Sequence, residues 1–338
     1  MTSPDTHSRP RTMSIGGATY DLFVRVNHET GTMPDGHAAF TLPLGDKVPV
    51  NEVVETCGGG ACNTSVGLAR LGCAASFEGI IGSDQWGERL LGTLKNEKVD
   101  VQNATIVENE VSSFSIILLA KNGERVILYE PGTNAHLRKA NFDRDIAEQM
   151  NWVYLNHIQE QSSDVQDDIV DMLTQKGDPR FTWNPGGHQI TAGLTSQVNS
   201  RLIPYTDLLL LNDEEALTFT RTDSIDKAMK TLVKAGAKTV FITRGKDGVT
   251  ATDGTKVYRC PIVPGSNVVD TTGAGDAFGT GATWALMRGL DFPTALKAGT
   301  INAASVVGTI GAQQGLLTET QMMDSLKNID LPVDVRPL

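Results

Sequence analysis

Short apolar runs alternate with helical patterns along most of this chain, and this alternation constrains the fold more than any other feature. The helical stretches include Asp164–Gln175, Glu214–Phe219 and Ile225–Ala235. The candidate strands around them are Met13–Ile15, Trp152–Leu155, Phe181–Trp183, Leu208–Leu211 and Thr239–Thr243. Several of these are continuously apolar, as expected of strands buried on both faces of a parallel sheet. We therefore predict an α/β fold with a doubly wound, mostly parallel sheet and helices on both faces.

Two stretches depart from the alternation. Ser112–Ala120 and Arg125–Glu130 are β-type runs separated by Lys-Asn-Gly-Glu, and Asn-Gly between apolar runs predicts a hairpin. The stretch from Asp21 to Thr56 is long and contains the β-like run Val50–Thr56. We expect parts of residues 21–56 and 112–130 to form a small β-sheet lid over one end of the main sheet. The segment 28–49 is expected to be lid decoration or a simple surface loop.

Composition sets the class of protein. The 338 residues are 40% hydrophobic and 20% charged, as in globular proteins, and suffice for one large domain or two smaller ones. We expect a single domain over residues 13–330, after a disordered lead-in over residues 1–12 that lacks the apolar core of a secretory signal. The net charge of −11 argues against nucleic-acid and anionic-membrane partners. Four cysteines without a CxxC pair fit buried thiols in a cytoplasmic protein.

The run from Asp270 to Phe278, D-T-T-G-A-G-D-A-F, predicts a glycine-rich turn that enters a helix of small residues, Ala277–Met287. Unpaired N–H groups at a helix start attract anions, and Gly273 and Gly275 would let a phosphate approach the main chain. Asp276 would then stand beside the anion and could take a proton from an alcohol. An ordinary turn with an aspartate as helix cap is the alternative for a bare GxGD.

A second glycine run, Gly58 to Gly60, also opens a helical stretch. Asn63 follows it and offers both a donor and an acceptor to a substrate hydroxyl, while a flexible loop before a helix is the alternative. Asp21 is predicted to follow the first strand, at the edge where open α/β sheets bind ligands, with a solvated aspartate as the alternative. His157 and Asn184 end two further strands, where they could line the same pocket. For His157 a structural role is preferred to that of a general base.

Together these motifs resemble the PfkB (ribokinase-like) family of sugar and nucleoside kinases over about residues 13 to 320. The run ending at Asp276 resembles the family pattern D-T-x-G-A-G-D-x-F. Residues 58–72 resemble G-G-x-x-x-N-x-A-x-x-L-A-x-L-G. The resemblance implies a catalytic base, an anion hole and a set of substrate-binding residues. The catalytic base would be Asp276. The anion hole would be formed by Gly273, Ala274 and Gly275. The substrate would be bound by Asp21, Gly58, Gly59 and Asn63.

The resemblance also implies a site for ATP. Asn212 and Glu215 match the family's N-x-x-E motif, in which a carboxylate holds Mg²⁺ through water, and an acidic helix start is the alternative. Thr243 and Gly245 match a T-x-G-x-x-G turn that contacts the nucleotide. Asn302 lies where the family packs adenine. A monovalent cation such as K⁺ near Asp270 and Gly311 is a further expectation. No Walker loop occurs in the sequence.

The function implied is a cytoplasmic, ATP-dependent kinase that phosphorylates a hydroxyl of a small neutral sugar. A nucleoside is the second candidate substrate, stacked on lid aromatics such as Phe23, Phe40 or Phe114. A sugar phosphate is the third, and it would need a basic cluster from Arg25, Arg125 or Arg138. A non-catalytic sensor is a different class, against which the intact Asp276 argues. An exposed lid sheet would favour a homodimer, because open strand edges tend to be covered.

Overall fold

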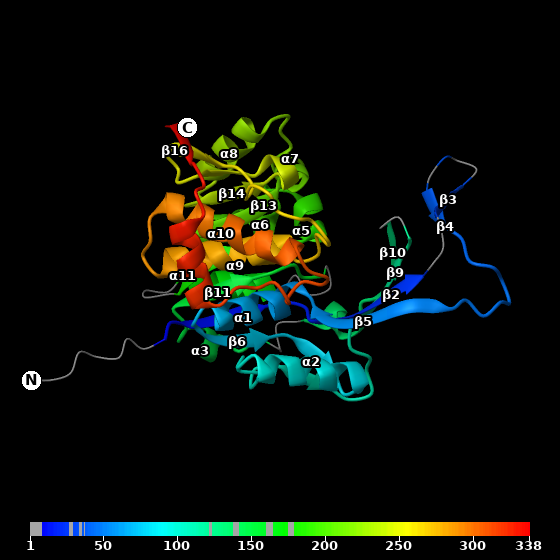
Figure 1. Ribbon diagram of the computed structural model, residues 1–338. Helices are drawn as coiled ribbons and strands as arrows, with labels where there is room; N and C mark the ends of the chain where they lie inside the picture. Colours follow the sequence, from blue (N-terminus) through cyan, green and yellow to red (C-terminus); the bar gives the residue numbers. More distant parts are fainter. Residues whose placement is uncertain are drawn as a thin grey trace, which may run out of the picture.

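A mixed sheet forms the centre of the molecule (Figure 1). The computed structural model describes residues 9–26, 30–33, 36, 38–121, 124–137, 142–159, 165–174 and 179–338. Within these residues the sheet has nine strands. In spatial order they are β17 (Asp334–Pro337), β16 (Lys256–Cys260), β15 (Val249–Thr252), β14 (Val240–Thr243), β13 (Leu208–Asn212), β12 (Arg180–Trp183), β11 (Trp152–Leu155), β1 (Arg11–Ile15) and β6 (Ala74–Glu78). The strands from β14 to β6 pair in parallel, and β15 to β17 add an antiparallel edge.

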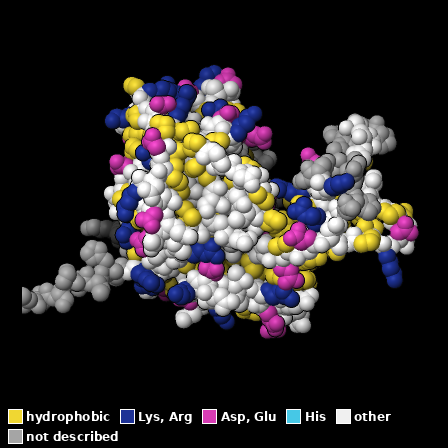
Figure 2. All heavy atoms as spheres, viewed as in Figure 1, with side chains coloured by type: hydrophobic (Ala, Val, Ile, Leu, Met, Phe, Trp, Pro, Cys, Tyr) yellow, Lys and Arg dark blue, Asp and Glu magenta, His cyan; other side chains and the backbone are white. Residues whose placement is uncertain are grey.

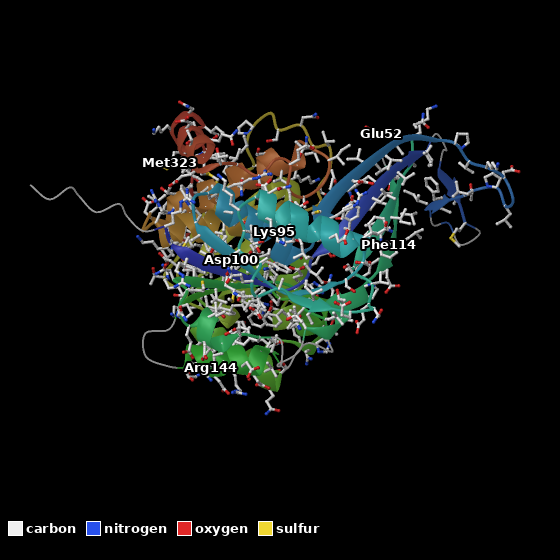
Figure 3. All side chains as sticks on the ribbon, turned by 90° about the horizontal axis from the view of Figure 1, so that it is seen from below. Glu52, Lys95, Asp100, Phe114, Arg144 and Met323 are labelled. Atoms are coloured by element: carbon white, nitrogen blue, oxygen red, sulfur yellow. The ribbon has the colours of Figure 1, made fainter. Side chains whose placement is uncertain are left out.

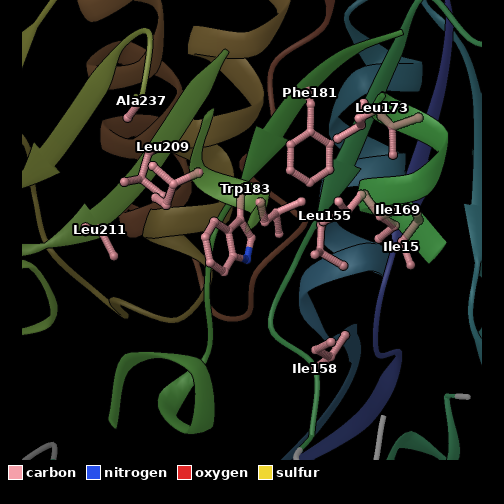
Figure 4. Packing of buried hydrophobic residues seen from close by; sticks show 14 of the residues in the cluster. Ile15, Leu155, Ile158, Ile169, Leu173, Phe181, Trp183, Leu209, Leu211 and Ala237 are labelled. Carbon is pink, nitrogen blue, oxygen red and sulfur yellow. The ribbon is translucent and has the colours of Figure 1, made fainter. Parts of the chain in front are cut away.

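Helices cover both faces of this sheet, as the alternation predicted. One face carries α3 (Arg144–Ala147), α4 (Val165–Leu173), α5 (Gly187–Ala192), α6 (Gln197–Leu202), α7 (Asp213–Thr220) and α8 (Ile225–Lys234). The other carries α1 (Gly60–Arg70), α9 (Ala274–Met287), α10 (Phe292–Val307) and α11 (Glu319–Asn328). Figure 4 shows the first core, where Phe181 and Trp183 of β12 pack beside Leu155 of β11. Burial on both faces explains why these strands read as continuous apolar runs.

A second sheet extends from one end of the main sheet, and we call it the lid. Its strand order is β10 (Arg125–Glu130), β9 (Phe114–Leu119), β2 (Thr19–Val26) and β5 (Val50–Gly58). Strands β9 and β10 are antiparallel, which confirms the predicted hairpin. Figure 3 shows these strands running away from the body, with Glu52 on β5 and Phe114 on β9. At its base, Trp86 of α2 (Gln85–Asn96) packs between Tyr20 and Phe114 at ring distances of 5.0 and 5.9 Å.

Three details differ from the predictions. Strand β1 begins at Arg11, so residues 11–12 belong to the main sheet rather than to the lead-in, of which residues 1–8 lie outside the described part. The segment predicted as a loop over residues 28–49 contains a ribbon of β3 (Thr30–Thr32) and β4 (Ala38–Phe40), while His28 lies outside the described residues. Helix α9 begins at Ala274, three residues before the predicted start.

The remaining short strands, β7 (Ile80–Gly82) and β8 (Thr105–Val107), pair in parallel beside the main sheet. All four cysteines are buried and free, as predicted. No helix in the described ranges combines the length and apolar character that a membrane crossing requires.

Candidate active site

The start of α9 is set by one glycine. Gly273, the residue before the helix, has φ 77° and ψ 3°, in the left-handed region that favours glycine. A Cβ on Gly273 would also overlap the side chain of Ala312. At Gly275 a Cβ would meet no other described atom within 4 Å. The first turn of α9 therefore presents open main chain, where N–H groups lack helical partners and favour an anion.

Asp276 is the third residue of α9 and lies at this open turn. The Asn63 side chain on α1 donates a hydrogen bond from Nδ2 to Asp276 Oδ2, at 2.8 Å. Burial of the carboxylate raises the pKa of Asp276 to about 6, and the bond from Asn63 opposes that rise. A carboxylate with this pKa is ionised at neutral pH and accepts a proton more readily than an ordinary aspartate.

A cavity of about 410 Å³ lies beside Asp276, between the lid and the body. Thr19 and Tyr129 line it from the lid strands β2 and β10, and Asp276 lines it from α9. The other lining residues are Gly16, Gly17, Gly59, Gly60, Ile80, Asn134, Leu137, His157, Ile158, Gln159 and Asn184. Burial lowers the pKa of His157, so this side chain is neutral at pH 7. The cavity therefore offers amides, the hydroxyls of Thr19 and Tyr129 and a neutral imidazole, with Asp276 as the carboxylate among its described lining residues.

Of the predicted glycine pair, Gly59 lines the cavity and Gly58 does not. Gly59 has φ 88°, and a Cβ on it would come within 2.6 Å of the Gly17 carbonyl oxygen. Two main-chain segments therefore lie against each other and face the cavity without side chains between them. The neighbouring Gly58 is required for a different reason, because a Cβ there would overlap the carboxylate of Asp21.

The expectation that Asp21 follows the first strand is wrong. Asp21 lies within β2 of the lid, six residues beyond the end of β1 at Ile15, and it is 8% exposed. Burial raises the pKa of its carboxyl to about 6, the hydrogen bond with Ser115 opposes this rise, and the charge of Asp270 adds to it. Asp21 packs under Gly58 and is not among the described residues that line the cavity. The apolar pattern could not reveal that the chain leaves the main sheet between Ile15 and Thr19.

Asn212 and Glu215 lie where β13 enters α7. Asn212 Oδ1 accepts from the Glu215 N–H, and Glu215 Oε2 accepts from the Asn212 N–H, both at 2.8 Å. This reciprocal arrangement is a capping box, the role of a helix start that was the alternative interpretation of the motif. It occupies the oxygen of Asn212 and one of the two oxygens of Glu215. Burial raises the pKa of Glu215, and the charges of Asp213 and Glu214 add to the rise. A cation is therefore favoured beside Glu215, although no group of three His, Cys, Asp or Glu side chains in the described residues forms a metal site by itself.

The other predicted nucleotide residues divide into two groups. Thr243 lies beside Asn212 in the register of β13 and β14, and Gly245 follows in a turn with φ 49°. The structure thus brings these three residues to one edge of the sheet. Asn302 is fully buried instead: Nδ2 donates to the Ala277 carbonyl at 2.8 Å, and Oδ1 accepts from the Leu317 N–H at 3.1 Å. Asn302 therefore links α9 to the segment after α10. This structural role differs from the direct contact with the nucleotide that was expected of Asn302.

Asp270, the first residue of the motif, connects the anion hole to the lid. Its Oδ1 accepts from Arg125 of β10 at 3.0 Å and from the Thr272 hydroxyl at 2.7 Å, and its Oδ2 accepts from the Gly311 N–H at 3.0 Å. Sequence reasoning placed Asp270 in the motif without assigning this role. Two of the partners, Arg125 and Gly311, lie far from Asp270 in the sequence, so no local pattern could show this role.

The side chains considered for other substrates lie elsewhere. Phe23 is 3% exposed within the lid, and Phe114 packs against Trp86. Arg25 pairs with Glu52 at 3.1 Å. Arg125 pairs with Asp270, and Arg138 lies outside the described residues. Tyr129 is the aromatic residue that lines the cavity within the described part of the chain, and sequence reasoning missed it because it belongs to the exposed edge strand β10.

Comparison with known proteins defines the class. The family model described as pfkB family carbohydrate kinase matches residues 34–319. The chain belongs to this family, and it is therefore a phosphotransferase with an alcohol group as acceptor. The family resemblance inferred from the motifs is thus confirmed.

The relatives include kinases with different substrates. A ribokinase of Haemophilus influenzae is 28% identical over 80% of this chain and 87% of its own. An adenosine kinase of Saccharomyces cerevisiae is 27% identical over 75% of this chain and 78% of its own. The structure of Arabidopsis thaliana ribokinase complexed with ribose and ATP matches with a TM-score of 0.78 at 21% identity, over 94% and 99% of the two chains. These likenesses support the ribokinase-like fold and a carbohydrate or nucleoside kinase, and leave the substrate open.

Proposed function

We propose that this protein transfers the γ-phosphate of ATP to a hydroxyl group of a small neutral sugar. The observation that carries the proposal is the cavity beside Asp276, whose described lining residues include amide and hydroxyl groups and no Lys or Arg. Amides and hydroxyls can both donate and accept, which suits a polyol. A sugar phosphate would call for cationic side chains, and Arg25 and Arg125 are held by Glu52 and Asp270.

In the proposed reaction Asp276 takes the proton from the attacking hydroxyl, which then attacks the γ-phosphorus in line with the leaving oxygen. The N–H groups around Gly273, Ala274 and Gly275 stabilise the negative charge on the transferred group. Gly59 shapes the wall of the sugar site, Gly58 leaves room for the carboxylate of Asp21, and Asn63 orients Asp276. Strands of the lid exclude water from the cavity and so suppress hydrolysis of ATP.

The nucleotide would lie at the edge formed by Asn212, Thr243 and Gly245. Mg²⁺, bound mainly by the phosphates, would be held through water by Glu215 and would neutralise charge on the nucleotide. A monovalent cation such as K⁺ near Asp270 and Gly311 remains a prediction. We also propose a cytoplasmic location, which rests on the family and the reduced cysteines.

A nucleoside is the second candidate substrate. The adenosine kinase among the relatives favours it, and so does Tyr129, whose ring reaches the cavity from the lid. A base could stack on this ring, in place of the phenylalanines considered from the sequence.

The first experiment measures ATP consumption with Mg²⁺ against neutral sugars, nucleosides and sugar phosphates. We expect a neutral sugar to be phosphorylated. Asp276→Asn should lower kcat by about 100-fold or more, the usual contribution of a general base, without lowering the melting temperature. The control is Asp330→Asn, which changes an exposed carboxylate far along the chain. Near-normal turnover by Asp276→Asn would refute the assignment of the base, and turnover of a sugar phosphate alone would refute the substrate class.

A further inference from the structure

Three side chains from distant parts of the chain form a hydrogen-bonded row that ends on Asp276. Gln313 Nε2 donates to Asn63 Oδ1 at 3.0 Å, and Asn63 Nδ2 donates to Asp276 Oδ2 at 2.8 Å. Asn63 is 3% exposed and Gln313 is 8% exposed, so water does not compete freely for these bonds. Gln313 comes from the segment after α10, and sequence reasoning assigned this residue no part in the site.

The row has a direction, because an amide nitrogen only donates and an amide oxygen only accepts. An N–H of Gln313 that points at Asn63 requires the oxygen of Asn63 on that side. The nitrogen of Asn63 must then face Asp276. If the Asn63 amide turned over, its oxygen would face the Asp276 carboxylate, and two acceptors would repel each other. Asn63 by itself has no preference between these two orientations.

Gln313 is itself held firmly. The main-chain carbonyl oxygen of Gln313 accepts from Arg70 Nη1 at 2.7 Å, and Arg70 Nη1 also donates to the main-chain carbonyl of Leu316 at 3.1 Å. Arg70 Nε and Nη2 donate to the two carboxylate oxygens of Glu97, at 2.9 and 2.7 Å. The Gln313 side chain contacts Cys62 Sγ at 3.2 Å as well. Such bidentate pairing fixes the position of the arginine and, through it, the main chain at Gln313.

We propose that Gln313 is a positioning residue that holds the Asn63 amide with its nitrogen toward Asp276. This inference rests on the proposed role of Asp276 as the base and adds a residue to it. The consequence is that one oxygen of Asp276 is held by Asn63 while the other is left for the substrate hydroxyl. Without Gln313 only the Asp276 carboxylate would favour this orientation of the Asn63 amide. The amide would then turn over more readily, and the carboxylate would lose its fixed donor for part of the time.

The test replaces Gln313 with leucine, which has a similar size and cannot form hydrogen bonds. We expect kcat to fall about tenfold with little change in either KM. The acid limb of the kcat–pH profile should move upward by about one pH unit, because a lost hydrogen bond to a carboxylate disfavours its ionised form. Gln314→Leu is the matched control, since Gln314 is the adjacent glutamine and is exposed. It should leave both kcat and the profile unchanged.

Gln313→Glu is the second variant and keeps the shape of the side chain. Its carboxylate would accept from the Asn63 nitrogen and so turn the Asn63 oxygen toward Asp276, which should lower kcat further than leucine does. A double variant tests the coupling: once Asn63→Leu is present, adding Gln313→Leu should cost nothing more. Additive losses from the two changes would overturn the proposal.

A readout without turnover separates this inference from the proposed function. The Asp276 carboxyl carbon, identified by the NMR signal lost in Asp276→Asn, is titrated in the wild-type protein and in Gln313→Leu. An upward shift of its pKa in Gln313→Leu supports the row even if no tested sugar is phosphorylated. An unchanged Asp276 pKa, or a lower kcat with an unmoved pH profile, would show that Gln313 only stabilises the fold and would overturn the proposal.

Discussion

At the scale of single residues, Asp276 meets two demands that normally conflict. Burial makes the carboxylate a better proton acceptor and raises its pKa to about 6, while the hydrogen bond from Asn63 keeps it ionised near neutral pH. A fully exposed aspartate would be ionised and weakly basic, and one buried without a donor would stay protonated. The position at the first turn of α9 also places it beside open N–H groups that favour the charged form.

This balance predicts the pH dependence of the reaction. Because the base must be ionised to accept a proton and its pKa is raised, activity should be full above about pH 7 and fall as the pH drops through 6. Well below pH 6 each further unit should lower kcat about tenfold. The measurement is a kcat–pH profile at saturating substrate and ATP. A profile flat down to pH 4, the ordinary range of an aspartate, would contradict the assignment.

At the scale of elements, two glycines two residues apart are needed at the start of α9 for different reasons. Gly273 holds a left-handed conformation against Ala312, whereas Gly275 lies within the helix with open space beside it. The first shapes the turn, and the second keeps the approach to the main chain clear.

The matched pair Gly273→Ala and Gly275→Ala should separate these roles. We expect Gly273→Ala to lower the free energy of unfolding by about 1–3 kcal/mol, because a side chain is strained at this φ and meets Ala312. Gly275→Ala should keep or slightly raise stability, since alanine favours a helix by up to about 1 kcal/mol over glycine. It should still lower turnover, because the new methyl group stands where the phosphate is proposed to approach. Urea unfolding and steady-state kinetics measure the two effects, and full activity in Gly275→Ala would contradict the anion hole.

The elements were predictable to the extent that local pattern determines them. Strands β11 and β13 are continuous apolar runs because both of their faces are covered, and their positions were found within a residue. The start of α9 was placed too late, because it depends on the contact between Gly273 and Ala312. The motifs likewise located Asp276 but not Gln313, since a contact across 250 residues leaves no periodic signal in the sequence.

At the scale of the whole molecule, the lid ends in an open strand edge. Strand β10 is exposed along its length, and its Val126, Ile127, Leu128 and Tyr129 are 38–53% exposed. Exposed hydrophobic side chains also lie along the lid on the face shown in Figure 2. On β5, Val50 and Val53 are each 50% exposed. An apolar edge strand of this kind is a template for pairing with another chain.

We therefore predict a homodimer formed through the lid. Sedimentation velocity should show a dimer at micromolar concentration, and Ile127→Lys should convert it to a monomer by placing a charge at the covered edge. Val335→Lys is the control, since Val335 is equally exposed on β17 at the far edge of the main sheet. A wild-type protein that sediments as a monomer throughout, or a dimer that tolerates Ile127→Lys but not Val335→Lys, would contradict this arrangement.

The hydrogen bond between Asn63 and Asp276 joins residues that are 213 positions apart in the chain. During synthesis, α1 leaves the ribosome long before α9 and the segment of Gln313 exist, so its buried amide must first be solvated or held by other groups. The base gains its fixed donor only when both ends of the domain have met. A nascent or partly unfolded chain should therefore be unable to bring ATP and a hydroxyl into reaction, and catalytic competence would report that the whole domain has closed.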